Sequence, residues 1–108
     1  MADWKSEIQA EFERASLARQ RNNEGQARVC ARRAAGIAVR EYLSRRGIRP
    51  PSNSAYDLLN MVKEDPQFPS NLKPIAEHLT LRVNEEFKLP VDADLVAEAK
   101  EFCDGLLD

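Results

Sequence analysis

Arginines crowd the middle of the chain, and they are the side chains there best suited to bind another molecule. Residues 27–47 read ARVCARRAAGIAVREYLSRRG, with apolar residues at helical spacing. Guanidinium groups bind anions through paired hydrogen bonds, although an arginine-rich helix is also typical of a solvated or salt-bridged face. Four arginines border the narrower apolar strip of this predicted helix and are candidate anion ligands: Arg28, Arg32, Arg33 and Arg40.

Gly36 lies between the last two of these arginines and suggests two roles for this strip. Glycine in a helix interior costs about 1 kcal/mol relative to alanine, so something should offset that cost. Close contact with a neighbouring helix is one reason, because small residues let helices approach. An anion held over Gly36 by Arg33 and Arg40 is the functional alternative.

A carboxylate, Glu41, falls within the broader apolar face of the same predicted helix. A buried charge without a partner is strongly destabilising, so Glu41 should be paired. Arg45, one turn later, is the local candidate, and Arg82 is the candidate from a distant helix. The pattern favours a structural ion pair over a catalytic acid.

The remaining reactive side chains form no catalytic or metal-binding pattern, and no cofactor is expected. His78 is the only histidine, and no cluster of His, Cys, Asp or Glu with metal-ligand spacing surrounds it. Neither a GxSxG turn nor a glycine-rich phosphate loop is present. The arginines lack the interleaved aromatic residues of single-strand binders. Cys30 and Cys103 are far apart in sequence, and two buried thiols are expected, with a disulfide as the alternative.

Composition indicates one globular domain over residues 1–108. Hydrophobic residues make up 43% and charged residues 31%, and no apolar run approaches the length of a membrane helix. The polar start MADWKSEIQ does not resemble a secretory signal, so a cytoplasmic location is expected. Residues 1–50 hold 11 lysines and arginines against 6 acids, whereas residues 51–108 hold 5 against 12. The halves should attract each other, or the basic half could bind an anion.

Clusters of proline, glycine and asparagine divide the chain into helices. The spacing predicts an all-α antiparallel bundle of about five helices over 4–22, 26–46, 54–63, 72–85 and 93–107. Asp3, Ser52 or Ser54, and Asp92 are the expected N-caps, and Gly47 should end the second helix. That helix is apolar on two sides, which predicts a homodimer through it or a second helix packed on it.

The order of these parts resembles the HEPN family. The segments that carry the resemblance are the alanine-rich helix ending in YLSRRG, the proline linker, the following YDLLNMV, the AEHL helix and the last helix LVAEAKEFCDGLL. Members fold as antiparallel helical bundles and often dimerise. Many are ribonucleases that use an arginine followed a few residues later by a histidine, while others act with a nucleotidyltransferase partner or bind nucleotides.

The HEPN resemblance aligns the nuclease arginine with Arg82, but the following VNEEFKLP contains no histidine. A histidine supplies a near-neutral acid and base, so its loss implies a non-catalytic member acting through dimerisation or a protein partner such as a nucleotidyltransferase. Two alternatives stay open. One is a degenerate ribonuclease around Arg82, and the other is a nucleotide- or RNA-binding module that uses the arginines of the second helix.

Overall fold

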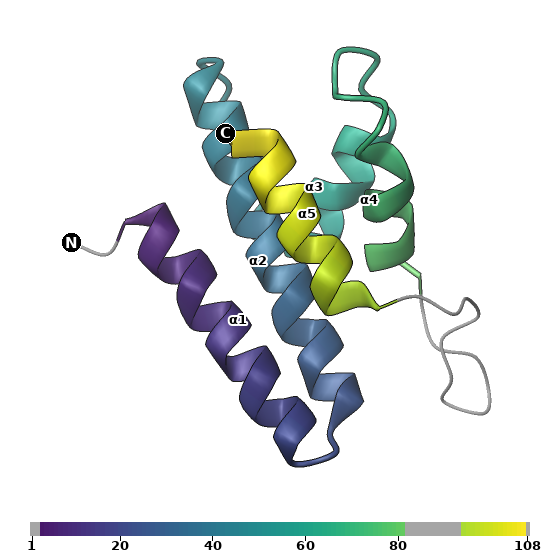
Figure 1. The fold of residues 1–108 in the computed structure, drawn as a ribbon. Helices are drawn as coiled ribbons and strands as arrows, with labels where there is room; N and C mark the ends of the chain where they lie inside the picture. The colour runs from purple at the N-terminus through teal and green to yellow at the C-terminus, as the bar shows by residue number, and fades with distance from the viewer. Residues whose placement is uncertain (1–2, 82–93, 108) are drawn as a thin grey trace.

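The computed structural model describes residues 3–81 and 94–107, and within them it contains helices but no strand. The expected all-α bundle of about five helices is confirmed. None of the helices in these two ranges has the length and apolar character needed to cross a membrane. The helices follow one another along the chain as α1 (Trp4–Gln20), α2 (Glu24–Arg45), α3 (Ala55–Lys63), α4 (Lys73–Leu79) and α5 (Leu95–Leu107) (Figure 1).

α2 is the central helix of the bundle. It forms the expected hairpin with α1 and also packs against α3 and α5, while α4 packs on α3 and α5 (Figure 1). Its buried residues lie on nearly all sides, as a helix enclosed by neighbours requires. They are mostly small, which lets the neighbouring helices approach: Ala27, Cys30, Ala31, Ala34, Ala35, Gly36, Ala38, Val39 and Leu43.

Aromatic side chains close the core where α2, α5 and the loop after α3 meet. The ring of Phe68 meets that of Tyr42 edge-on at a centroid distance of 5.4 Å and lies 5.8 Å from the ring of Phe102. Cys30 and Cys103 are buried free thiols, which confirms the expectation drawn from their spacing. Burial raises the pKa of the Cys103 thiol to about 12, and nearby Asp104 adds to this shift.

The turn between α1 and α2 lies two residues earlier in the chain than the sequence pattern predicts. Asn22 adopts a left-handed backbone conformation, and the N–H of Asn23 donates to the carbonyl of Ala18 at 2.8 Å. This hydrogen bond ends α1 at Gln20 rather than at the predicted residue 22. The Asn23 side chain then caps α2, which begins at Glu24 instead of residue 26.

Most of the predicted caps are confirmed. Asp3 accepts a hydrogen bond from the Ser6 N–H at 2.7 Å, and this bond lowers the pKa of its carboxyl group. Gly47, with φ of 72°, lies just after the end of α2. The Ser54 side chain caps α3 by accepting from the Asp57 N–H. The predicted capping box, in which the Asp57 carboxylate would accept directly from the Ser54 N–H, is replaced by a link through Ser52. The Ser52 hydroxyl accepts from the Ser54 N–H and donates to the Asp57 carboxylate.

Two helix ends differ from prediction. α4 was expected to reach residue 85, but its last residue is Leu79. Thr80 follows it, and its hydroxyl donates to the Ala76 carbonyl and accepts from Lys63 Nζ. The Asp94 side chain accepts from the Ala97 N–H at 3.2 Å just before α5, which begins at Leu95 and not at the predicted residue 93. The predicted cap, Asp92, lies outside the described residues. Residues 82–93 lie outside the described part of the chain.

Gly36 explains the second apolar face of α2. A β-carbon added there would lie 2.6 Å from the β-carbon of Ala55, so α3 rests directly on this glycine. Close helix packing therefore accounts for Gly36, because Ala55 lies where a β-carbon would point. Gly36 also lines the second cavity described below, so the anion alternative stays a prediction. Val39 and Leu43 of the same face are also buried within the chain. Another helix of the same chain, α3, thus packs on the second apolar face of α2. A homodimer through α2 stays a prediction.

Candidate functional site: an arginine-lined groove

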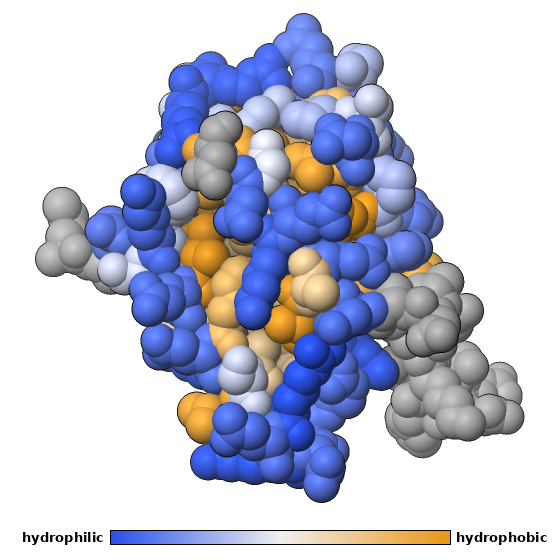
Figure 2. All heavy atoms as spheres, viewed as in Figure 1, coloured by the Kyte–Doolittle hydropathy of each residue, from blue (hydrophilic) through white to orange (hydrophobic). Residues whose placement is uncertain are grey.

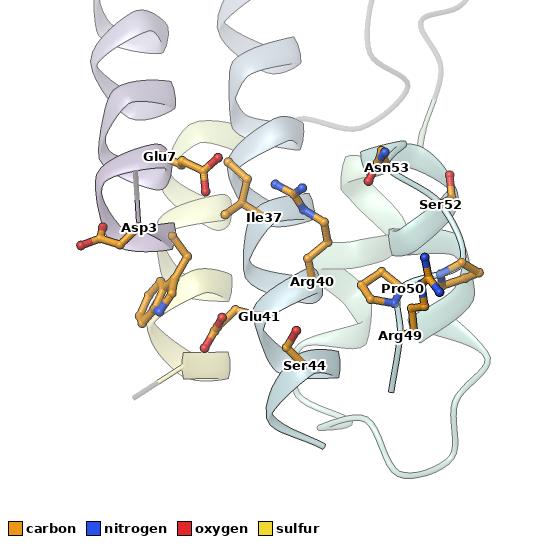
Figure 3. Close-up of a pocket in the computed structure, with 12 residues that line it drawn as sticks. Asp3, Glu7, Ile37, Arg40, Glu41, Ser44, Arg49, Pro50, Ser52 and Asn53 are labelled. Carbon is orange, nitrogen blue, oxygen red and sulfur yellow. The ribbon is translucent and has the colours of Figure 1, made fainter. Parts of the chain in front are cut away.

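A groove runs between α1, α2 and the linker that leads to α3. Two overlapping cavities, of about 670 Å³ and 530 Å³, form it and share Glu7, Ile37, Arg40 and Asn53. Its floor is α2, one wall is the N-terminal half of α1, and the other is residues 49–56. Figure 3 shows the first cavity, with Arg40 projecting from α2 into the space between α1 and the linker.

Three arginines line this groove without an ion partner. Arg33 and Arg40 come from α2, and Arg49 comes from the linker. Within residues 3–81 and 94–107, none of the three forms a salt bridge or a hydrogen bond with another side chain. Unpaired guanidinium groups on one groove create a local positive potential that a bound anion would neutralise.

The other two predicted anion ligands have different positions. Arg32 lines the end of the groove, but its Nε donates to the Leu79 carbonyl at 2.7 Å and so ties α2 to the last turn of α4. Arg28 lines neither cavity and lies near Glu24, whose carboxyl pKa it helps to lower. Sequence reasoning missed Arg49, because it lies outside the helix and only the fold of the linker brings it to Arg40.

The α1 wall of the groove is acidic. Asp3, Glu7 and Glu11 share that side of the helix and face the groove. Glu11 is buried, with 7% of the residue exposed, and is paired with Arg14 at 3.1 Å. The groove therefore has a cationic side on α2 and the linker and a carboxylate side on α1. Such a site suits a ligand that bears both an anionic group and hydrogen-bond donors.

Aromatic residues also line the groove, although the sequence does not interleave them with the arginines. Trp4 of α1 lines the first cavity and Tyr56 of α3 lines the second. Both are partly buried, and each brings a ring to one of the two cavities. Arginines beside aromatic rings are typical of surfaces that bind nucleotides by charge and stacking.

The predicted pair at Glu41 is present. Arg45 Nε lies 3.1 Å from Glu41 Oε1, at a half-buried position. Arg45 also donates to the Leu107 carbonyl at 3.0 Å and lies over the Trp4 ring, so it joins the ends of α1, α2 and α5. The pair is therefore a local structural ion pair within α2, as the sequence suggested, and the other contacts of Arg45 connect it to α1 and α5. The alternative partner, Arg82, lies outside the described residues.

His78 has a structural contact that the sequence did not reveal. Its Nδ1 lies 2.7 Å from Glu98 Oε1, which joins α4 to α5 away from the arginine groove. In the part of the chain that the structure describes, no three His, Cys, Asp or Glu side chains gather closely enough to hold a metal ion.

Comparison with known proteins gives no relatives. Neither a protein-family model, nor a curated protein, nor a solved structure matches the chain. The HEPN resemblance therefore stays a prediction from the sequence.

Proposed function

We propose that the chain is a non-catalytic, HEPN-like binding domain whose arginine groove holds the phosphate groups of a nucleotide or of RNA. The observation that carries this proposal is a difference between two sets of arginines, those bonded to other segments of the fold and those that line the groove. Arg19, Arg32, Arg45 and Arg46 are bonded to neighbouring residues and join segments of the fold. By contrast, Arg33, Arg40 and Arg49 have no such partner among the described residues, and all three line the groove.

Phosphate is the anion that this groove fits best. Arg33 and Arg40 lie seven residues apart on α2, a separation of about 10 Å along the helix. With Arg49 beside the linker, the cations follow the groove instead of surrounding one point. An elongated row of cations suits a ligand with more than one phosphate. The N-terminal end of α3 borders the second cavity and adds a weak attraction for anions.

The acidic wall favours a nucleotide over a simple polyanion. Carboxylates accept hydrogen bonds from the exocyclic amino groups of bases. Glu7 faces both cavities from α1, opposite Arg40 on α2 (Figure 3). A ligand with phosphates on the arginine side could therefore present its bases to Glu7. Trp4 and Tyr56 then supply rings on which a base can stack.

The test is a binding titration of fluorescently labelled single-stranded RNA, with a mononucleotide as a separate arm, at low salt. The triple variant Arg33→Ala/Arg40→Ala/Arg49→Ala should bind RNA at least about tenfold more weakly than the unaltered protein. The control variant Arg21→Ala/Arg28→Ala/Lys73→Ala removes the same charge outside the groove. It should lose much less affinity. Equal losses in the two variants would show non-specific attraction and overturn the proposal.

The same samples address the ribonuclease alternative. Recovery of intact RNA after incubation is the expected result for a non-catalytic domain, because the groove contains no histidine to act as acid and base. Cleavage that disappears in Arg82→Ala would instead support the degenerate nuclease. A nucleotidyltransferase partner and a homodimer stay predictions from the sequence.

A further inference from the structure

A second groove lies along the neighbouring face of α1, and Trp4 lines both this groove and the arginine groove. α1 and α5 both pack on α2, but they do not pack closely on each other, and an opening of about 380 Å³ remains between them. Its lining is mainly apolar, with Trp4, Ile8 and Phe12 from α1 and Cys103 and Leu107 from α5. Figure 2 shows a hydrophobic strip on this face, crossed by hydrophilic side chains. We propose that this groove receives an amphipathic helix with acidic flanks, supplied by another protein.

The shape of the groove points to a helical occupant. Trp4, Ile8 and Phe12 are spaced by four residues and form a row about 12 Å long on one side of α1. A helix laid along this row would contact α1 and α5 together and add a fourth member to the α1–α2–α5 group (Figure 1). Apolar residues at the same spacing on the occupant would meet the row, as in other helix-in-groove contacts.

The charges on the rim point to acidic flanks on the occupant. Lys5 Nζ lies 5.5 Å from the centroid of the Trp4 ring, and Lys100 Nζ lies 5.6 Å from that of Phe12. Each ammonium group lies over an aromatic ring of the lining, so carboxylates of a bound helix could pair with the two lysines there. Asp104 is the single carboxylate among the lining residues. Cationic flanks would meet like charges, which disfavours their binding.

A second copy of the chain fits this groove less well than a foreign helix. In the part of the chain that the structure describes, the large hydrophobic side chains that are exposed are Leu17 and Ile48, which lie on different helices or loops. The remaining apolar helix face of a second copy is the same row of Trp4, Ile8 and Phe12. Packing that row on itself would bring Lys5 and Lys100 of both copies to one interface, where like charges repel, whereas a partner helix with acidic flanks meets no such repulsion.

The experiment uses two synthetic helical peptides of about 18 residues with the same leucine row, one with glutamate flanks and one with lysine flanks. Trp4 is the only tryptophan, so its fluorescence reports occupancy of this groove if the peptides lack tryptophan. The glutamate peptide should shift the emission, and the lysine peptide should bind at least about tenfold more weakly.

The double variant Lys5→Glu/Lys100→Glu should reverse this preference, whereas the matched control Arg21→Glu/Lys73→Glu should keep it. Circular dichroism checks that both variants are folded. Because Trp4 also lines the arginine groove, the variant Arg33→Ala/Arg40→Ala/Arg49→Ala must retain binding of the glutamate peptide, and its loss there would overturn the assignment to this groove.

Three further results would overturn the proposal. The first is no emission change with either peptide up to about 1 mM, which would place the Kd above the millimolar range. The second is equal affinity for the two peptides. The third is a dimer in light scattering that Lys5→Glu/Lys100→Glu dissociates, because the occupant would then be a second copy.

Discussion

Gly36 of α2 lies against Ala55 of α3 so closely that a β-carbon on the glycine would come within 2.6 Å of the alanine β-carbon and 2.8 Å of its α-carbon. This contact sets the position of α3 and of the linker before it. The linker in turn brings Arg49 and the residues around Ser54 to the groove that Arg33 and Arg40 line. A packing contact between two small residues thus shapes the candidate binding site.

Replacing Gly36 with alanine should therefore destabilise the fold. Alanine gains about 1 kcal/mol in helix propensity, but the clash is with backbone atoms and forces α2 and α3 apart, at a cost of about 1–3 kcal/mol. Gly36→Ala should unfold at lower denaturant concentration. Gly25→Ala is the matched control, because its nearest contact, Asn23 Oδ1, is 3.8 Å away. A Gly36→Ala variant more stable than the control would contradict the packing.

Among the three groove arginines, Arg40 should matter most for RNA binding, because it lines both cavities. Arg40→Ala should weaken binding more than Arg33→Ala or Arg49→Ala does. It should also reduce the slope of the binding constant against salt concentration, on logarithmic axes, by about 1. Titrations at several salt concentrations measure this slope. An unchanged slope would mean that Arg40 meets no phosphate.

Arg19 holds three helices at one end of the bundle, and this contact should depend on pH. Its guanidinium lies 2.8 Å from Glu24 and 2.6 Å from Asp94, which lowers the pKa of both carboxyl groups. Because these pKa values are lower in the folded than in the unfolded state, the stabilisation is complete above the ordinary carboxyl pKa of about 4 and is lost as pH falls through the folded values.

Arg19→Ala should lower the free energy of unfolding at pH 7 by about 1 kcal/mol, since the groups are partly exposed. The difference from the unaltered protein should shrink below about pH 4. Urea unfolding at a series of pH values measures it. Arg21→Ala, which removes a charge without an ion pair among the described residues, should show no comparable pH dependence.

Cys103 should resist alkylation while the protein is folded. Burial raises the pKa of its thiol to about 12, so little of the reactive thiolate exists at pH 8. Iodoacetamide should modify the folded protein at least about a hundredfold more slowly than the urea-unfolded protein. Mass spectrometry counts the modified thiols. Rapid labelling of Cys103 under native conditions would contradict its burial.

The helices themselves followed from the sequence, because apolar spacing, Asp3, Ser54 and Gly47 act within a few residues of the backbone that they shape. The central place of α2 followed too, since a helix apolar on two sides must be covered on both. The end of α4 did not, and the residue that follows it, Thr80, contacts Lys63 of α3, a tertiary contact that the local sequence does not encode.

The candidate site depended far more on tertiary structure. The sequence alone identified Arg33 and Arg40 as neighbours on one side of a helix, which is a local property of helical periodicity. It also grouped them with Arg28, which lines neither cavity, and with Arg32, which lines the end of the groove but donates to the Leu79 carbonyl. The packing of α1 and α3 on α2 is what places three further residues in the groove, Glu7, Arg49 and Tyr56. Contacts between residues distant in the chain depend on how the helices pack. The periodicity of one helix does not predict which residues of other helices it will contact.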